Sequence, residues 1–199
     1  MNWDIEDKIK SEGYNIICGC DEAGRGPLAG HVFAAAVVLP HGIDVPGLND
    51  SKKLTEKQRE KLFDIITELA EDYAVASASV EEIEEINILN ASMLAMKRAV
   101  DALKTKPDYA LIDGNIARGF DVEARPVIKG DALSPSIAAA SILAKVSRDR
   151  HCMEMDALYP EYGFAKHKGY ATKDHREAVL KHGVSPVHRK SFLKKLLGE

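Results

Sequence analysis

Short runs of apolar residues along the chain predict five β-strands. The first two runs flank a glycine-rich turn at residues 24–30, and the third alternates apolar and polar positions as a half-buried strand does. The fourth and fifth runs are each followed, within three residues, by an aspartate. The predicted strands span residues 15–20, 31–39, 73–80, 109–112 and 125–128.

Longer segments with apolar residues at the helical period predict five helices. Thr55 and Gln58 have the spacing of a capping box at the start of the first helix. In the second, Leu89, Met93 and Met96 form a stripe that would face the core. The predicted helices span residues 55–72, 87–104, 134–159, 172–182 and 189–197.

The order of these elements predicts a mixed α/β fold. The first three strands can pair with near neighbours, whereas the fourth and fifth follow a pattern that calls for helical crossovers. The alanine run at residues 138–140 indicates close packing of a helix on the sheet rather than chemistry.

The composition is that of an ordinary globular protein, with 45% hydrophobic and 29% charged residues among 199. No apolar run approaches the roughly 18 residues that a membrane helix needs, and the first ten residues lack the apolar segment of a signal peptide. Cys18, Cys20 and Cys152 provide neither a disulfide framework nor zinc-ligand spacing. We therefore expect a reduced, cytoplasmic protein without a membrane partner.

The net charge of −4 conceals an uneven distribution of charge along the chain. Residues 160–199 contain nine Lys or Arg and four Asp or Glu, a net charge of +5, which leaves −9 on the remainder. An acidic body with a basic end is typical of a protein that binds a polyanion at that end. A solvated helical tail would carry the same charges, so charge alone leaves both interpretations open.

Acidic residues follow three of the predicted strands. Asp21 and Glu22 end the first strand directly before the glycine-rich turn, Asp113 follows the fourth strand, and Asp131 follows the fifth. Ligands bind at the carboxyl ends of strands in open α/β sheets, so these side chains are expected to meet at one edge. A single strand-end aspartate more often caps the next turn, but three strand ends together favour a shared site.

Four carboxylates at one edge would repel each other unless cations lie between them. Oxygen ligands of this kind suit Mg²⁺ or Mn²⁺, and two such ions about 3.5–4 Å apart can catalyse phosphodiester hydrolysis. The acids alone therefore predict metal-dependent phosphoryl chemistry and do not specify a substrate.

Longer motifs make the prediction specific. The string CDEAGRGPLAG at residues 20–30 closely resembles the signature of ribonuclease HII, the type 2 ribonuclease H of bacteria. The resemblance covers nearly the whole chain in the family's order. It continues at DSKKL (50–54), NIL (87–89), LIDGN (111–115), KGD (129–131), AAASILAK (138–145), KGY (168–170) and HRKSF (188–192).

This resemblance implies a ribonuclease H-like mixed five-stranded sheet flanked by helices. Residues 1–159 would form the catalytic domain and residues 160–199 a C-terminal helical extension that binds substrate. By resemblance, the catalytic residues and ligands of two Mn²⁺ or Mg²⁺ ions are Asp21, Glu22, Asp113 and Asp131. The implied enzyme, a monomer, hydrolyses the RNA strand of RNA/DNA hybrids. It also cuts 5′ of single ribonucleotides in duplex DNA, leaving a 3′-hydroxyl and a 5′-phosphate.

The resemblance also implies how the substrate is recognised. In the family, the turn formed here by Gly24, Arg25 and Gly26 reads the ribose 2′-hydroxyl, which both donates and accepts hydrogen bonds. Tyr170 would pack on the sugar of the following deoxynucleotide, where a ring face rejects an added hydroxyl. Lys52 and the basic C-terminal segment would contact backbone phosphates.

Three other interpretations are compatible with parts of this pattern. The sister family ribonuclease HIII shares the fold and metals but lacks the arginine of the turn, and it typically carries an additional N-terminal domain. A non-catalytic duplex-binding module and another two-metal nuclease or phosphatase are the remaining alternatives. Asp149 is kept outside the metal set, either as a residue behind the site or as a surface residue paired with Arg148 or Arg150.

Overall fold

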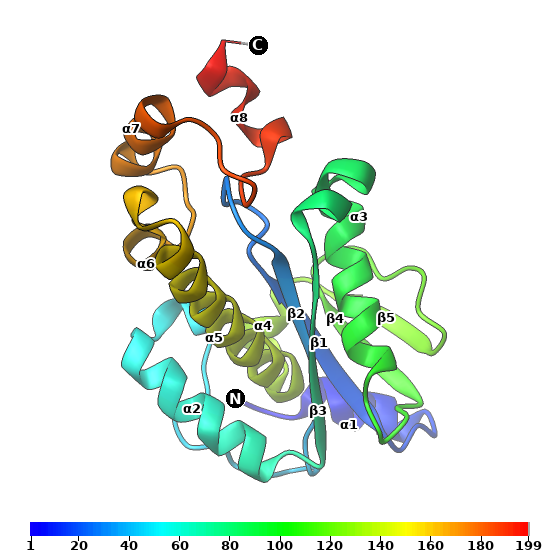
Figure 1. The fold of residues 1–199 in the computed structure, drawn as a ribbon. Coiled ribbons are helices and arrows are strands. Elements are labelled where there is room, and N and C mark those ends of the chain that lie inside the picture. The colour runs from blue at the N-terminus through cyan, green and yellow to red at the C-terminus, as the bar shows by residue number, and fades with distance from the viewer. Residues whose placement is uncertain (199) are drawn as a thin grey trace.

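The computed structural model describes residues 1–198, and Glu199, the last residue of the predicted C-terminal extension, lies outside the described residues. A five-stranded sheet in the order β3-β2-β1-β4-β5 runs through its centre (Figure 1). β2 is antiparallel to both β1 and β3, whereas β4 is parallel to both β1 and β5. The strands are β1 (Ile17–Ala23), β2 (Val32–Val38), β3 (Asp72–Ala78), β4 (Tyr109–Asp113) and β5 (Glu123–Val127). The predicted mixed five-stranded sheet is confirmed.

Helices cover both faces of this sheet. α3 packs on one face, and α5 with α2 covers the other (Figure 1). α6, α7 and α8 gather at the end of the sheet from which the β1–β2 turn emerges. The helices are α1 (Asp4–Ser11), α2 (Glu56–Leu69), α3 (Val80–Asp101), α4 (Gly130–Leu133), α5 (Pro135–Leu158), α6 (Phe164–His167), α7 (Lys173–His182) and α8 (Lys190–Leu197), with 3₁₀ turns η1 (Ser51–Lys53) and η2 (Pro160–Tyr162). Among these described helices, none combines the length and apolarity needed to cross a membrane.

Capping boxes mark the starts of α2 and α3. The box predicted at Thr55 and Gln58 is present at the start of α2. A second box, formed by Ser79 and Glu82, starts α3 at Val80. The prediction that this helix begins at residue 87 and that the preceding strand reaches residue 80 was therefore wrong.

Asn87 explains why the helical pattern seemed to begin there. Its φ of 65° breaks the helical backbone inside α3, and its side-chain oxygen accepts hydrogen bonds from the backbone N–H groups of Leu89 and Asn90. It therefore caps the second part of α3, in the way that asparagine caps a new helix.

One expectation about connections was wrong, and one N-terminal helix was missed. β5 follows β4 through a loop, residues 114–122, instead of a helical crossover. Ala117, Phe120 and Val122 of this loop pack against the core beside α3, so the loop covers the sheet as a helix would. α1 was not predicted, and its buried Glu6 accepts a 2.6 Å hydrogen bond from Ser134 in front of α5.

Close packing of α5 on β1 fixes where the strand-end acids lie. A Cβ at Gly19 would come within 2.1 Å of the Ser136 carbonyl carbon, so only glycine allows this approach. The alanines at residues 138–140 are fully buried in the same layer, which confirms the packing predicted for them. α5 consequently runs along β1, from Ser136 beside Gly19 to Arg148 beside Gly24, and so passes Asp21 and Glu22.

Candidate active site

The four acids predicted from the strand ends lie at one edge of the sheet. Asp21 and Glu22 lie in the last part of β1, and Asp113 ends the neighbouring parallel strand β4. Asp131 lies in α4, directly after the strand-to-helix connection, and its backbone N–H donates to Asp113 Oδ1 at 3.3 Å. The sheet topology therefore brings together residues that are up to 110 positions apart in the sequence.

Burial and mutual repulsion act on three of these carboxyl groups. The pKa of Asp21 is raised well above its usual value, chiefly by burial and then by the nearby charges of Glu22 and Asp113. Burial also raises the pKa of Glu22, against the opposing effect of Arg25. The pKa of Asp113 is raised by burial and by Asp131. The site thus holds more negative charge than its own residues neutralise.

Two side-chain cations pair with acids of this cluster. Arg25 Nη1 lies 3.3 Å from Glu22 Oε1, and Lys52 Nζ donates to Asp131 Oδ2 at 2.9 Å. Within residues 1–198, no three His, Cys, Asp or Glu side chains converge around one point where an ion could bind. Glu22 and Asp131 turn toward Arg25 and Lys52. The four expected metal ligands therefore lie near one another, but they do not point toward a common ion position.

The donor chemistry of the cluster nevertheless fits a hard divalent cation. All four groups offer oxygen atoms, and the charges of Glu22 and Asp113 add to burial in raising the pKa of Asp21, so a cation beside these carboxylates would relieve their repulsion. Asp21, Glu22, Asp113 and Asp131 are the residues that would hold Mg²⁺ or Mn²⁺.

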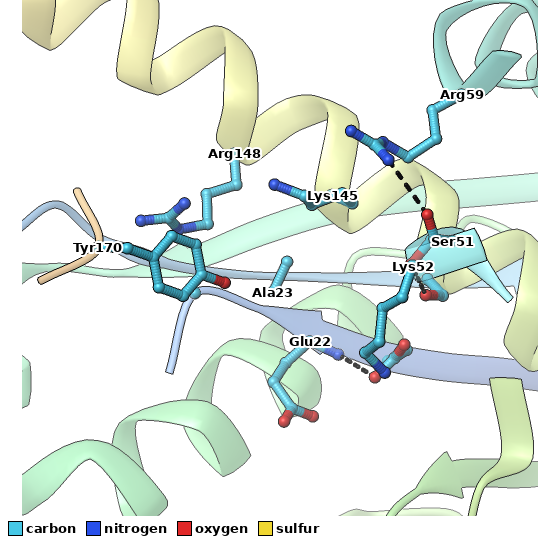
Figure 2. A pocket seen from close by; sticks show the side chains of 11 residues that line it. Glu22, Ala23, Ser51, Lys52, Arg59, Lys145, Arg148 and Tyr170 are labelled. Atoms are coloured by element: carbon cyan, nitrogen blue, oxygen red, sulfur yellow. Dashed lines mark hydrogen bonds between the residues drawn. The ribbon is translucent and has the colours of Figure 1, made fainter. Parts of the chain in front are cut away.

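A pocket beside the acids contains several of the other predicted residues. Asp21, Glu22, Gly24, Lys52 and Tyr170 all line it. Figure 2 shows Glu22 on one side of Ala23 and the cationic side chains of Arg59, Lys145 and Arg148 on the other. Acids and cations on opposite sides of one pocket suit a phosphodiester substrate, whose phosphate is negative and whose reaction uses metal ions.

The Gly24–Gly26 turn lies at the mouth of this pocket. Gly24 has a φ of 102°, and a Cβ there would lie 2.1 Å from Arg148 Nε. A Cβ at Gly26 would lie 3.7 Å from the Tyr170 ring, which places the turn and the ring side by side. The Leu28 N–H donates to the Gly169 carbonyl at 2.8 Å, so the turn is tied directly to the loop that carries Tyr170.

Asp149 lies buried behind the pocket rather than on the surface. It is 4% exposed, pairs with Lys145 of the same helix and lies 3.6 Å from Arg59. Arg59 in turn donates to the carbonyl oxygens of Ser51 and Leu54, around the η1 turn that carries Lys52. The alternative of a surface residue paired with Arg148 or Arg150 was wrong, and the supporting role behind the site fits these contacts.

Several residues of the site were not singled out from the sequence. Lys145, Arg148 and Ser141 lie on the face of α5 that lines the pocket, together with Arg59 of α2. The seven-residue spacing of Ser141 and Arg148, with Lys145 between them, is the signal of one helix face that could have found them. Arg59 gave no such signal because it reaches the pocket from another helix.

Comparison with known proteins gives the family. The model of the family described as Ribonuclease HII matches residues 18–195. Ribonuclease HII of Clostridioides difficile is 53% identical over 193 residues, 97% of this chain and 76% of the relative. Ribonuclease HII of Desulfitobacterium hafniense is 58% identical over 187 residues, 94% of this chain and 72% of the relative.

The fold agrees with this family. The crystal structure of ribonuclease H2 from Pyrococcus horikoshii superimposes with a TM-score of 0.75 at 27% identity, and covers 92% of this chain and 97% of its own. The mixed sheet, the flanking helices and the acids at the sheet edge are thus found in a chain whose residues 18–195 match one family. The chain belongs to the ribonuclease HII family, whose members are metal-dependent endoribonucleases.

Proposed function

We propose that this enzyme hydrolyses the RNA strand of RNA/DNA hybrids and cuts duplex DNA on the 5′ side of a single embedded ribonucleotide. The observation that carries the proposal is one pocket that joins the acids Asp21 and Glu22 to Gly24 of the turn and to Tyr170. The candidate groups for the reaction and for recognition of the sugar therefore line one pocket.

We propose a role for each group of residues in the site. Asp21, Glu22, Asp113 and Asp131 would hold two divalent ions, Mn²⁺ or Mg²⁺, which when bound activate the attacking water and stabilise the leaving 3′-oxygen. Hydrolysis of the P–O3′ bond transfers the phosphoryl group to water and leaves a 3′-hydroxyl and a 5′-phosphate.

Recognition of the substrate is assigned to the turn, the tyrosine and the cations. Gly24, Arg25 and Gly26 would contact the 2′-hydroxyl, and the exposed ring of Tyr170 would pack on the next, deoxyribose sugar. The Lys52 ammonium group donates a hydrogen bond to Asp131. We propose that it contacts a phosphate once a metal ion neutralises that carboxylate. Residues 160–199, as the basic C-terminal extension, would hold the duplex of a monomeric, cytoplasmic enzyme.

The experiment that tests this function uses three end-labelled duplexes: DNA with one ribonucleotide, all-DNA, and an RNA/DNA hybrid. Each is incubated with Mg²⁺, with Mn²⁺ or with chelator. We expect one metal-dependent cut 5′ of the ribonucleotide, cleavage of the hybrid, and no cleavage of all-DNA. Cleavage of the hybrid alone would overturn the single-ribonucleotide part of the proposal, and no cleavage at all would overturn the whole.

Asp113→Asn is the matched negative control for this experiment. It replaces the carboxylate at the end of β4 by an amide of the same size, so the site keeps its shape. Cleavage that persisted in this variant at the wild-type rate would indicate a contaminating nuclease or remove Asp113 from the metal site.

A further inference from the structure

Arg189 carries a fully buried guanidinium group against the β1–β2 turn. It is 0% exposed and donates five hydrogen bonds to four main-chain carbonyl oxygens of the turn. These are Gly24 at 2.7 Å, Arg25 at 3.0 Å, Pro27 at 2.9 Å and Gly30 at 2.9 and 2.7 Å. Within residues 1–198 it forms no ion pair with a carboxylate. The turn is thus built around a buried cation that is stabilised by carbonyl dipoles and by the Phe192 ring, whose centroid lies 5.3 Å from the guanidinium carbon.

This clamp fixes which way two peptide units of the turn face. In a planar trans peptide, the carbonyl of one residue and the N–H of the next point in opposite directions. Because the Gly24 and Arg25 carbonyl oxygens face Arg189 in the interior, the N–H groups of Arg25 and Gly26 face away from it. Neither N–H group donates to another atom among the described residues. The clamp therefore leaves two adjacent main-chain donors free at the turn.

These donors lie next to the pocket that contains the acids. Gly24 and Tyr170 line that pocket together, and Gly26 lies beside the Tyr170 ring. Arg189 reaches the same region through its backbone as well, since its N–H donates to the Leu28 carbonyl at 2.8 Å. One residue at the start of α8 thus holds the turn and, through Leu28 and Gly169, the loop of the tyrosine.

We propose that Arg189 is a positioning residue for recognition of the ribonucleotide, which orients the Arg25 and Gly26 N–H groups toward the 2′-hydroxyl. The inference rests on the proposed function, because it assumes that the turn reads this hydroxyl. Lysine cannot replace the arginine, since one ammonium group has three donors on a single atom and cannot span four carbonyl groups.

A purely structural role makes a different prediction from a positioning role. If Arg189 only attached α8 to the body of the protein, its replacement would lower the folded fraction and weaken binding of every duplex equally. If it orients the two donors, its replacement weakens binding of the ribonucleotide duplex and leaves binding of all-DNA unchanged. The ratio of the two Kd values separates these cases, because partial unfolding affects both values in the same protein sample alike.

The test measures this ratio by fluorescence anisotropy in chelator, where no duplex is cut. The full-length wild-type protein, Arg189→Lys and Arg189→Gln are each titrated onto all-DNA and onto the same duplex with one ribonucleotide. A neutral hydrogen bond corresponds to roughly a fivefold change in affinity, so we expect a wild-type preference of at least about fivefold that falls to about one in both variants. A ratio that stays at the wild-type value in either variant would overturn the inference.

Tyr162→Phe is the matched control. It removes the 3.0 Å hydrogen bond from Tyr162 to the Gly183 carbonyl in the same C-terminal region without touching the turn. Its ratio should equal that of the wild type. A wild-type enzyme that cuts the single-ribonucleotide duplex but shows no binding preference would overturn the inference and keep the proposed function, whereas a lack of cleavage would reject the proposed function itself.

Discussion

The conformation of Gly24 gives a quantitative prediction about the turn. In Gly24→Ala, a side chain must adopt a φ of 102°, which costs an L-residue about 1–2 kcal/mol. The new Cβ would also lie 2.1 Å from Nε and 2.4 Å from Cδ of Arg148, so that buried side chain must move. Its hydrogen bond to the Lys168 carbonyl at 2.8 Å would then be lost, at a cost of about 1.5–3 kcal/mol for a charged donor.

We therefore expect Gly24→Ala to lower the free energy of unfolding by roughly 2.5–5 kcal/mol, a large part of the stability of a typical domain. Urea denaturation followed by circular dichroism measures this loss as a shift of the midpoint. Gly26→Ala is the matched control, because its Cβ would make an ordinary contact at 3.7 Å with the Tyr170 ring. It should change stability by less than about 1 kcal/mol.

A double-mutant cycle tests the reasoning directly. Arg148→Ala removes the side chain that the new Cβ would meet, so the combination with Gly24→Ala should be less destabilised than the sum of the single variants, by about 1 kcal/mol or more. Arg148 also has a buried Nε and Nη1 without hydrogen-bond partners among the described residues, which limits the cost of removing it. Strictly additive effects would refute the overlap as the cause.

Three further outcomes follow from the site and the C-terminal region. Asp113→Asn should abolish cleavage and keep the fold and duplex binding, and full activity in the assay on labelled duplexes would remove Asp113 from the metal site. Tyr170→Ala should slow cleavage at a single ribonucleotide at least about tenfold. The free energy of unfolding should change by less than about 1 kcal/mol, because the ring is 46% exposed. An unchanged cleavage rate would contradict the packing of the ring on the sugar. Burial lowers the pKa of His188 in the folded protein to about 4. As the pH falls, this histidine is therefore protonated in the unfolded chain before it is protonated in the folded protein, and the free energy of unfolding should decrease between about pH 6.5 and pH 4. His188→Gln should flatten that part of the stability curve in urea titrations, and an unchanged slope would show that this histidine is not responsible.

Local sequence features determined much of the fold. The apolar runs predicted the five strands, and the acids that follow the first, fourth and fifth strands predicted the edge where the site lies. Capping and hydrophobic periodicity act over a few residues, so they can be read without a structure. The one missed box, at Ser79 and Glu82, was also visible in the sequence.

The tertiary structure alone decided which distant residues complete the site. Asp149 faces Arg59, 90 positions earlier in the chain, because the packing of α2 on α5 buries that side of the helix. Pairing of Glu22 with Arg25 and of Asp131 with Lys52 likewise depends on rotamers and on a contact across 79 residues. No local pattern encodes the contacts of Asp149 with Arg59 and of Asp131 with Lys52.

Arg189 shows most clearly the difference between what the sequence determines and what the tertiary structure decides. The motif HRKSF at residues 188–192 marked the segment by resemblance, but a charged residue in a basic tail is expected on the surface. Folding instead places it at 0% exposure inside the turn formed by residues 24–30, more than 150 positions earlier in the chain. The sequence by itself determined the strands, the family and the acids, because these depend on local patterns and motifs. Only the tertiary structure decided that an arginine near the C-terminus orients the turn, because the carbonyl groups that stabilise its buried charge come together only when β1 and β2 are paired.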